Sequence, residues 1–146
     1  MIEVTGNLWT YKLPDGSNPD VRVITTNGAV RKDGACVMGR GCALEAAKKW
    51  PALPFQLGNQ IKIYGNKVFY FDEPNLFTFP VKHHWREEAD LELIKQSAYE
   101  IQARAIQSWE TIVMPRPGCG NGRLSWDTVK DVISPILDNR FHIITW

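Results

Sequence analysis

The sequence is poor in the residues that mark disulfide-rich, metal-binding and membrane proteins. Its three cysteines are an odd number and show no close paired spacing, so we expect reduced thiols in a cytoplasmic compartment rather than a disulfide framework. No apolar run approaches the roughly 20 residues that a membrane-spanning helix needs, and no signal peptide precedes the opening "MIEVTGNLWTY". We therefore expect a soluble, cytoplasmic protein with no membrane partner.

An excess of charge of either sign is also missing. The 17 Lys and Arg residues nearly balance the 16 Asp and Glu residues, which leaves a formal net charge of +1. Such a balance provides no overall attraction to nucleic acid or to an anionic membrane surface. Any recognition that depends on charge must therefore be local.

What the sequence does contain is the composition of an ordinary globular domain. Its 146 residues are 44% apolar and 23% charged, and a chain of this length buries roughly two-thirds of its unfolded surface without metals or disulfides. The sequence has no internal repeats, low-complexity tracts or linkers. We therefore expect residues 1–146 to form a single domain.

The order of the expected helices and strands indicates the fold class. Apolar residues at helical spacing predict a helix over residues 88–109, and shorter helices are expected over residues 43–50 and over residues 125–133, with Ser125 as N-cap. The expected strands are short, β-branched or alternating, and they cover residues 21–27, 59–65, 67–73, 76–81, 111–115 and 141–146. This order predicts an α/β sandwich with a mixed sheet.

Two glycine-rich loops each join an expected strand to an expected helix. Gly39 and Gly41 lie in the first loop, and the second, "PRPGCGNGRLSW", runs from Pro115 to Trp126. Glycines let backbone N–H groups approach a ligand, and the helix that follows adds partial positive charge at its N-terminus. Two such units can hold a diphosphate from both sides, whereas one alone is more often a tight turn. Neither loop matches the P-loop or the Rossmann fingerprint, which disfavours triphosphate hydrolysis and Rossmann-type dinucleotide binding.

Four motifs, in chain order, resemble the macrodomain family: "TGNLW", "VMGRGCALEAAKKWP", "FPVKHHWRE" and "MPRPGCGNGRLSW". They span nearly the whole chain and are similar to the lysine-dependent ADP-ribosyl glycohydrolases, the group that includes the DarG antitoxins and the terminal ADP-ribose protein glycohydrolase. The resemblance implies a three-layer α/β/α sandwich with a mixed central sheet, which binds ADP-ribose at the carboxyl edge of that sheet. It implies neither a cofactor nor a metal.

The resemblance also assigns residues to the ligand. It implies that Asn7 reads the adenine amino group and that Asn27 lies under the distal ribose, although either residue is also a natural turn former. The first loop would contact the distal ribose and the phosphates, and the second would surround the diphosphate, with Arg123 as a phosphate contact or a surface charge. The full set implied for ligand binding is Asn7, Leu8, Asn27, Met38, Gly39, Arg40, Gly41, Cys42, Pro117, Gly118, Cys119, Gly120, Asn121, Gly122 and Arg123.

Lys82 follows the strand expected at residues 76–81, and the resemblance implies that it is the catalytic nucleophile. In the family, this lysine attacks the anomeric carbon of the distal ribose, displaces the macromolecular group, and forms a ribosyl-lysine species that water resolves. Because the pKa of a free lysine is about 10.4, the chemistry needs a lowered pKa, and we expect partial burial or the cationic neighbours His83, His84 and Arg86 to supply it. The alternative is a solvated charge at a strand end.

The paired histidines do not predict a metal site. Adjacent side chains of an extended segment point to opposite faces, so His83 and His84 cannot easily share an ion, and the third histidine lies far along the chain. We expect one of the pair to lie near Lys82 and the other to face solvent. Trp85 and Arg86 either offer a docking place for a nucleic-acid base and phosphate, or cover the core and lie in water.

Some family members carry an Asp in the second loop where this chain has Gly122, which puts a mechanism that uses this carboxylate in doubt. We therefore expect ADP-ribosylated DNA bases as substrates in preference to modified protein, and the resemblance to DarG raises a cognate ADP-ribosyltransferase toxin as a partner. The alternatives are a non-catalytic reader of ADP-ribose and a hydrolase of small ADP-ribose metabolites. Two lengthened loops, near Tyr11 and near Lys32, and the terminal Trp146 either shape the ligand pocket or are surface features.

Overall fold

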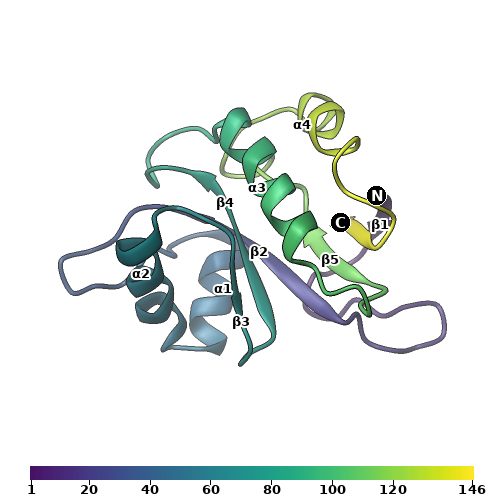
Figure 1. Cartoon of the computed structure of the whole chain (residues 1–146), viewed down its shortest axis with the longest axis horizontal. Coiled ribbons are helices and arrows are strands. Elements are labelled where there is room, and N and C mark those ends of the chain that lie inside the picture. The colour runs from purple at the N-terminus through teal and green to yellow at the C-terminus, as the bar shows by residue number, and fades with distance from the viewer.

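A six-stranded mixed sheet runs through the middle of the molecule (Figure 1). The computed structural model describes the whole chain, residues 1–146. The strands lie in the order β1-β6-β5-β2-β4-β3, and every neighbouring pair is parallel except β3 with β4. The strands are β1 (Ile2–Thr5), β2 (Val21–Asn27), β3 (Phe69–Phe71), β4 (Leu76–Lys82), β5 (Ile112–Pro115) and β6 (Phe141–Thr145).

Two helices cover each face of the sheet (Figure 1). They are α1 (Gly41–Lys49) and α2 (Leu53–Tyr64) on one face, and α3 (Leu91–Arg104) and α4 (Trp126–Ile133) on the other. Successive residues of β4 point to opposite faces, so that Leu76 packs in the core under α1 and α2, whereas Phe77 packs in the core under α3 and α4. The expected three-layer α/β/α sandwich with a mixed sheet is therefore confirmed. None of the helices is long and apolar enough to cross a membrane.

The pairing of β2 with β4 places two predicted site residues side by side. The first six residues of β4 are buried, as expected of a strand covered on both faces, and only Lys82 at its end is partly exposed. The register pairs Asn27 with Lys82, after an irregularity between Thr26 and Asn27. Both residues therefore lie at the carboxyl edge of the sheet, where open α/β sheets bind their ligands.

The strand predicted at residues 59–65 is wrong, because this segment forms the second half of α2. Leu53 and Leu57 are the buried side chains of this helix, and Ile61 continues the same face at a spacing of four residues. Ile63 is 61% exposed. The alternation of Ile61 and Ile63 therefore resembled a strand only because the window excluded the start of the helix.

The other helices begin near their expected positions. α1 starts at Gly41, two residues before the prediction, and α3 covers Leu91–Arg104 within the expected range 88–109. The carboxylate of Asp90 starts α3, because its Oδ1 accepts hydrogen bonds from the N–H groups of Glu92 and Leu93. Ser125 does lie at the N-cap of α4, but its side chain makes no capping hydrogen bond.

Candidate active site

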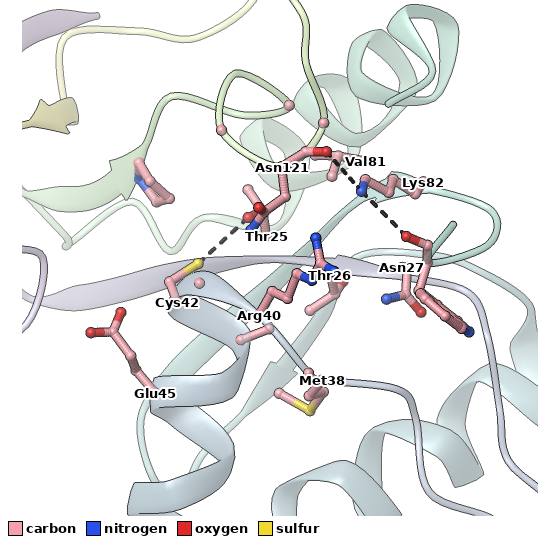
Figure 2. A pocket seen from close by; sticks show the side chains of 18 of the residues that line it. Thr25, Thr26, Asn27, Met38, Arg40, Cys42, Glu45, Val81, Lys82 and Asn121 are labelled. Carbon is pink, nitrogen blue, oxygen red and sulfur yellow. Dashed lines mark hydrogen bonds between the residues drawn. The ribbon is translucent and has the colours of Figure 1, made fainter. Parts of the chain in front are cut away.

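A cavity of about 870 Å³ opens at the carboxyl ends of β2, β4, β5 and β6. Its wall is formed by these strand ends and by the two glycine-rich loops (Figure 2). The structure thus gathers most of the predicted site residues from distant parts of the sequence. The predicted residues that line the cavity are Asn7, Leu8, Asn27, Met38, Gly39, Arg40, Gly41, Cys42, Lys82, Gly118, Gly120, Asn121, Gly122 and Arg123.

Pro117 and Cys119, which we expected to contact the ligand, do not line the cavity. Pro117 is buried, and the Cys119 thiol donates a hydrogen bond to its carbonyl oxygen over 3.5 Å. Cys119 also packs against the core under α3 and α4, and burial raises the pKa of its thiol. These two side chains support the second loop from inside, and Gly118, Gly120, Asn121 and Gly122 of the same loop face the cavity instead.

Lys82 presents its amine between two loops. Its Nζ donates to the carbonyl oxygen of Asn121 over 3.1 Å and to that of Trp85 over 3.5 Å. The first contact reaches across to the second glycine-rich loop, 39 residues further along the chain (Figure 2). The amine is therefore held in one place at the cavity wall. A freely solvated lysine, which was the alternative, would have no such contacts.

The electrostatic surroundings of Lys82 favour its neutral form. Partial burial lowers the pKa of the amine below the ordinary value of lysine, and the nearby guanidinium groups of Arg123 and Arg40 lower it further. The two carbonyl oxygens that accept from Nζ favour the ammonium form, but burial and the two cations outweigh them. Lys82 therefore has the environment that a nucleophilic amine requires.

The sequence analysis named the wrong cationic neighbours for Lys82, namely His83, His84 and Arg86. His83 lies beside the carboxylate of Asp90, with Nε2 and Oδ2 2.9 Å apart, and its side chain is 56% exposed. His84 stacks on the ring of Trp85, and the Arg86 guanidinium lies 4.7 Å from the centroid of the same ring. The side chains of His83, His84 and Arg86 thus have partners other than the amine, and the charges that act on it come from the two glycine-rich loops.

The first glycine-rich loop exposes the N-terminus of α1 to the cavity. Gly41 begins the helix with a φ of 59°, in the left-handed region that favours glycine. Arg40 at the N-cap makes no side-chain capping bond, and the first turn carries no acidic residue, so the positive end of the helix dipole is not neutralised by the protein. An added Cβ at Gly41 would lie 3.4 Å from Asn121, which shows how closely the two loops approach each other.

Asn7 and Asn27 both shape the turns in which they lie. Oδ1 of Asn7 accepts a hydrogen bond from the N–H of Trp9 over 2.8 Å. The Asn27 amide donates to the carbonyl oxygen of Val37 and accepts from the N–H of Ala29, each over 2.9 Å. The alternative role as turn former is therefore present for both residues, and their position on the cavity wall leaves ligand contact open as well.

The cavity wall also contains residues that the sequence analysis missed. Thr25 and Thr26 precede Asn27 at the end of β2, a position from which their role could have been expected, since the neighbouring Asn27 was assigned to the site. Arg31 belongs to the lengthened loop near Lys32, whose part in the pocket was one of the two alternatives. Other such residues had no signal in the sequence, because they come from a turn, from the middle of a helix and from the loop after β4. These residues are Trp9, Glu45 and Glu87.

The two lengthened loops differ in their relation to the cavity. Arg31, from the loop near Lys32, lines the wall, whereas no residue of the lengthened segment 11–20 does. The terminal Trp146 also lies on the wall and is 88% exposed. The loop near Lys32 and the C-terminus therefore shape the cavity, and the loop near Tyr11 does not.

Positive charge is concentrated at the cavity although the whole chain is nearly neutral. Five cationic side chains line the wall, from Arg31, Arg40, Lys82, Arg86 and Arg123, against only two carboxylates, from Glu45 and Glu87. Nowhere in the chain do three or more His, Cys, Asp or Glu side chains gather so that they could hold a metal ion. The arrangement suits an anionic ligand that is held by backbone N–H groups and guanidinium groups.

A thiol also lies on the wall. The Cys42 sulfur lies 3.5 Å from the hydroxyl of Thr25 (Figure 2). Burial raises the pKa of this thiol, and the nearby carboxylate of Glu45 raises it further. Because the thiolate is the nucleophilic form of cysteine, Cys42 is a much poorer candidate nucleophile than Lys82.

The chain is similar in sequence to curated proteins from two bacteria. No family model matches it. It is 28% identical over 121 residues to the DNA ADP-ribosyl glycohydrolase of Thermus aquaticus, in an alignment that covers 75% of this chain and 33% of that protein. It is 29% identical over 105 residues to the protein of the same name from Mycobacterium tuberculosis, covering 64% of this chain and 30% of the relative. The chain thus spans about a third of the length of the curated relatives that it matches.

Solved structures show the fold. The macrodomain of Mycobacterium tuberculosis DarG superposes with a TM-score of 0.78 at 22% identity, over 98% of this chain and 95% of that one. The macrodomain of Thermus aquaticus DarG gives 0.75 at 27% identity, over 99% and 97%. Thermosipho africanus DarTG in complex with ADP-ribose gives 0.67 at 20% identity, over 88% and 40%. The macrodomain fold and the resemblance to DarG that the four motifs indicated are both confirmed.

Proposed function

We propose that this DarG-like macrodomain is an ADP-ribosyl glycohydrolase, which binds ADP-ribose in the cavity and removes it from a DNA base through Lys82. The observation that carries the proposal is the position of the Lys82 amine. It lies at the carboxyl end of β4, is held against the second glycine-rich loop by Asn121, and has a lowered pKa. A glycohydrolase needs a reactive group at the place where the bound ribose would end. A reader only binds ADP-ribose and needs no such group.

The shape and charge of the cavity support the choice of ADP-ribose as ligand. Its volume of about 870 Å³ lies within the usual range for sites that enclose a small molecule. The diphosphate would lie between the N-terminus of α1 and the second glycine-rich loop, near Arg40 and Arg123. The adenine would lie at the opposite end, near Asn7 and Trp146, and the distal ribose near Asn27 and Lys82.

The reaction that we propose needs no cofactor. The lone pair of neutral Lys82 Nζ attacks the anomeric carbon of the distal ribose and forms a C–N bond as the glycosidic bond breaks. The bonding electron pair leaves with the DNA base, which takes up a proton. Water then attacks the same carbon, the C–N bond breaks with return of its electrons and a proton to nitrogen, and free ADP-ribose and lysine result.

The preference for DNA over modified protein rests on the second loop. Gly122 stands where some family members have an Asp, so no carboxylate of this loop is available to assist the hydrolysis of a protein-linked ester. The relatives that the chain matches are named DNA ADP-ribosyl glycohydrolases. We further propose that a DNA ADP-ribosyltransferase is the partner enzyme, since some reaction of that class must supply the substrate.

The direct test is release of ADP-ribose by the wild-type protein from three classes of substrate. These are ADP-ribosylated single-stranded DNA, ADP-ribosylated protein, and small esters such as ADP-ribose phosphate. We expect rapid release from the DNA, with the unmodified oligonucleotide as second product in mass spectrometry. Binding of ADP-ribose in calorimetry without release from any substrate would establish the reader alternative, and release from the small esters alone would establish the metabolite hydrolase.

The pKa of Lys82 predicts how the rate depends on pH. Because only the neutral amine attacks, kcat should rise about tenfold per pH unit and reach its plateau below about pH 10, where a free lysine would titrate. Arg123→Gln removes a cation that lowers this pKa, so the rising limb should move to higher pH and the rate at neutral pH should fall. The measurement is single-turnover kinetics between about pH 6 and pH 10. A variant that only weakens substrate binding would leave the position of the limb unchanged, which would contradict the role given to Arg123.

A further inference from the structure

The segment that follows Lys82 forms a braced rim beside the amine. We call residues 83–88 the rim loop. Its far end is fixed by two backbone hydrogen bonds, from the N–H of Ala89 to the carbonyl oxygen of Gly122 over 3.0 Å and from the N–H of Asp90 to that of Val81 over 2.8 Å. Its near end is fixed by the contact of His83 with Asp90. The loop is therefore tied to the second glycine-rich loop and to the end of β4, so that its side chains have a defined position relative to the cavity.

Trp85 is the large aromatic side chain that the rim loop presents to the cavity. It lines the cavity and is 41% exposed, and the terminal Trp146 is the only other exposed large apolar side chain on this wall. Its carbonyl oxygen accepts from Lys82 Nζ over 3.5 Å, which places its backbone next to the proposed reacting group. His84 stacks on the indole with ring centroids 5.7 Å apart at 28°, and the N–H of Arg86 donates to Nδ1 of His84 over 3.2 Å. These contacts hold an aromatic surface in place at low cost in entropy on binding.

Two arginine side chains share the cavity wall with this aromatic surface. The guanidinium of Arg86 lies 4.7 Å from the centroid of the Trp85 ring, and both residues line the cavity. The loop after β2 leaves the sheet alongside the rim loop, because the N–H of Gly28 donates to the carbonyl oxygen of Lys82 over 3.1 Å, and it contributes Arg31 to the same wall. An exposed aromatic ring in a wall that also carries guanidinium groups is a combination by which proteins bind single-stranded nucleic acid.

We propose that the DNA base that carries the ADP-ribose takes the place of the Arg86 guanidinium over the Trp85 ring, and that the displaced guanidinium contacts a phosphate that flanks this base. The inference rests on the proposed function and names the part of the substrate that lies outside the ADP-ribose cavity. The leaving group is attached at the carbon that Lys82 attacks, and the backbone of Trp85 lies at that amine. Stacking requires a base whose face is free, so the substrate is single-stranded or has the modified base extruded. An ADP-ribosyl ester of a protein Asp or Glu offers no such face.

The test measures binding rather than turnover, so that it stays separate from the test of catalysis. In a Lys82→Ala background, calorimetry compares free ADP-ribose with an ADP-ribosylated single-stranded oligonucleotide. We expect the oligonucleotide to bind more tightly than ADP-ribose, and the added Trp85→Ala substitution to weaken oligonucleotide binding about ten- to hundredfold with no more than about twofold change for ADP-ribose. Trp85→Phe should restore most of the lost affinity. The alanine variant keeps the backbone carbonyl that contacts residue 82 in the wild type.

Two controls complete the experiment. Tyr99→Ala removes an aromatic side chain that is 58% exposed on α3 and does not line the cavity, and it should bind both ligands as its parent does. Arg86→Gln should reduce the slope of log affinity against log salt by about 0.7 for the oligonucleotide, the value of one phosphate contact on a single strand. Equal binding of the oligonucleotide with and without Trp85 would overturn the proposal. An equal loss with ADP-ribosylated protein would also overturn it, because it would show a platform for protein.

Discussion

Lys82→Ala should lower kcat/KM for release of ADP-ribose from DNA by about a thousandfold or more, the scale of loss when a covalent nucleophile is removed. Binding of free ADP-ribose should persist, because the diphosphate would be held by the helix N-terminus and the glycine-rich loops rather than by the amine. The reason for the size of the effect is that no other nucleophile is ready on the cavity wall. The thiol of Cys42 has a raised pKa, and neither of the two carboxylates on the wall forms an ion pair or hydrogen bond with Lys82.

Three further measurements test whether this loss is due to the missing nucleophile. Lys82→Arg keeps a cation in place but cannot supply a neutral amine, so it should be as inactive as the alanine variant. Lys95→Ala, at an exposed position of α3, should be fully active. The ribosyl-lysine adduct can open its ribose ring to an imine, so borohydride added during turnover should reduce this imine and leave a stable ADP-ribose adduct on a peptide that contains Lys82, seen by mass spectrometry. Hydrolysis by Lys82→Ala at the wild-type rate, or an adduct on another residue, would show that the mechanism is wrong.

Gly122→Asp should weaken ADP-ribose binding about ten- to hundredfold and should not create an efficient hydrolase of protein-linked esters. A Cβ at this position would lie 2.5 Å from the carbonyl oxygen of Gly118 and 2.7 Å from the Cβ of Ala89. Such distances force the second glycine-rich loop to move, and with it the Asn121 carbonyl that holds Lys82. Gly122→Asp therefore does more than add the missing carboxylate, because atoms of Gly118 and Ala89 already occupy the space that a side chain would need.

The comparison that isolates this effect uses alanine at two places in the same loop. Gly122→Ala should lose ADP-ribose affinity nearly as much as Gly122→Asp, because the clash arises at the Cβ. A Cβ at Gly120 meets nothing within 4 Å, so Gly120→Ala should keep the wild-type midpoint of thermal unfolding whereas Gly122→Ala lowers it. Tight ADP-ribose binding by Gly122→Asp, together with rapid hydrolysis of a protein-linked ester, would contradict the steric argument and favour a loop that adapts easily.

The sequence by itself determined the features that depend on neighbours along the chain. Apolar periodicity predicted α3, and β-branched runs bounded by turns predicted β2, β4, β5 and β6. Glycines beside helix starts located both loops of the cavity, and Lys82 was placed at the end of its strand. These signals succeed because helix and strand periods are local, and because parallel strands bring whatever follows them to one edge of the sheet. The one strand that was wrong, at residues 59–65, lies where a short window fits both periods.

Only the tertiary structure decided which groups act on Lys82. The sequence suggested His83, His84 and Arg86, which are adjacent in the chain, but these side chains turn towards Asp90, Trp85 and the solvent. The cations that lower its pKa and the carbonyl oxygen that positions its amine come from Arg40, Arg123 and Asn121, up to 42 residues away. Electrostatic effects depend on distance in space and on burial, and neither is set by separation along the chain. For the same reason Pro117 and Cys119, although within a correctly located loop, turned out to support it from inside.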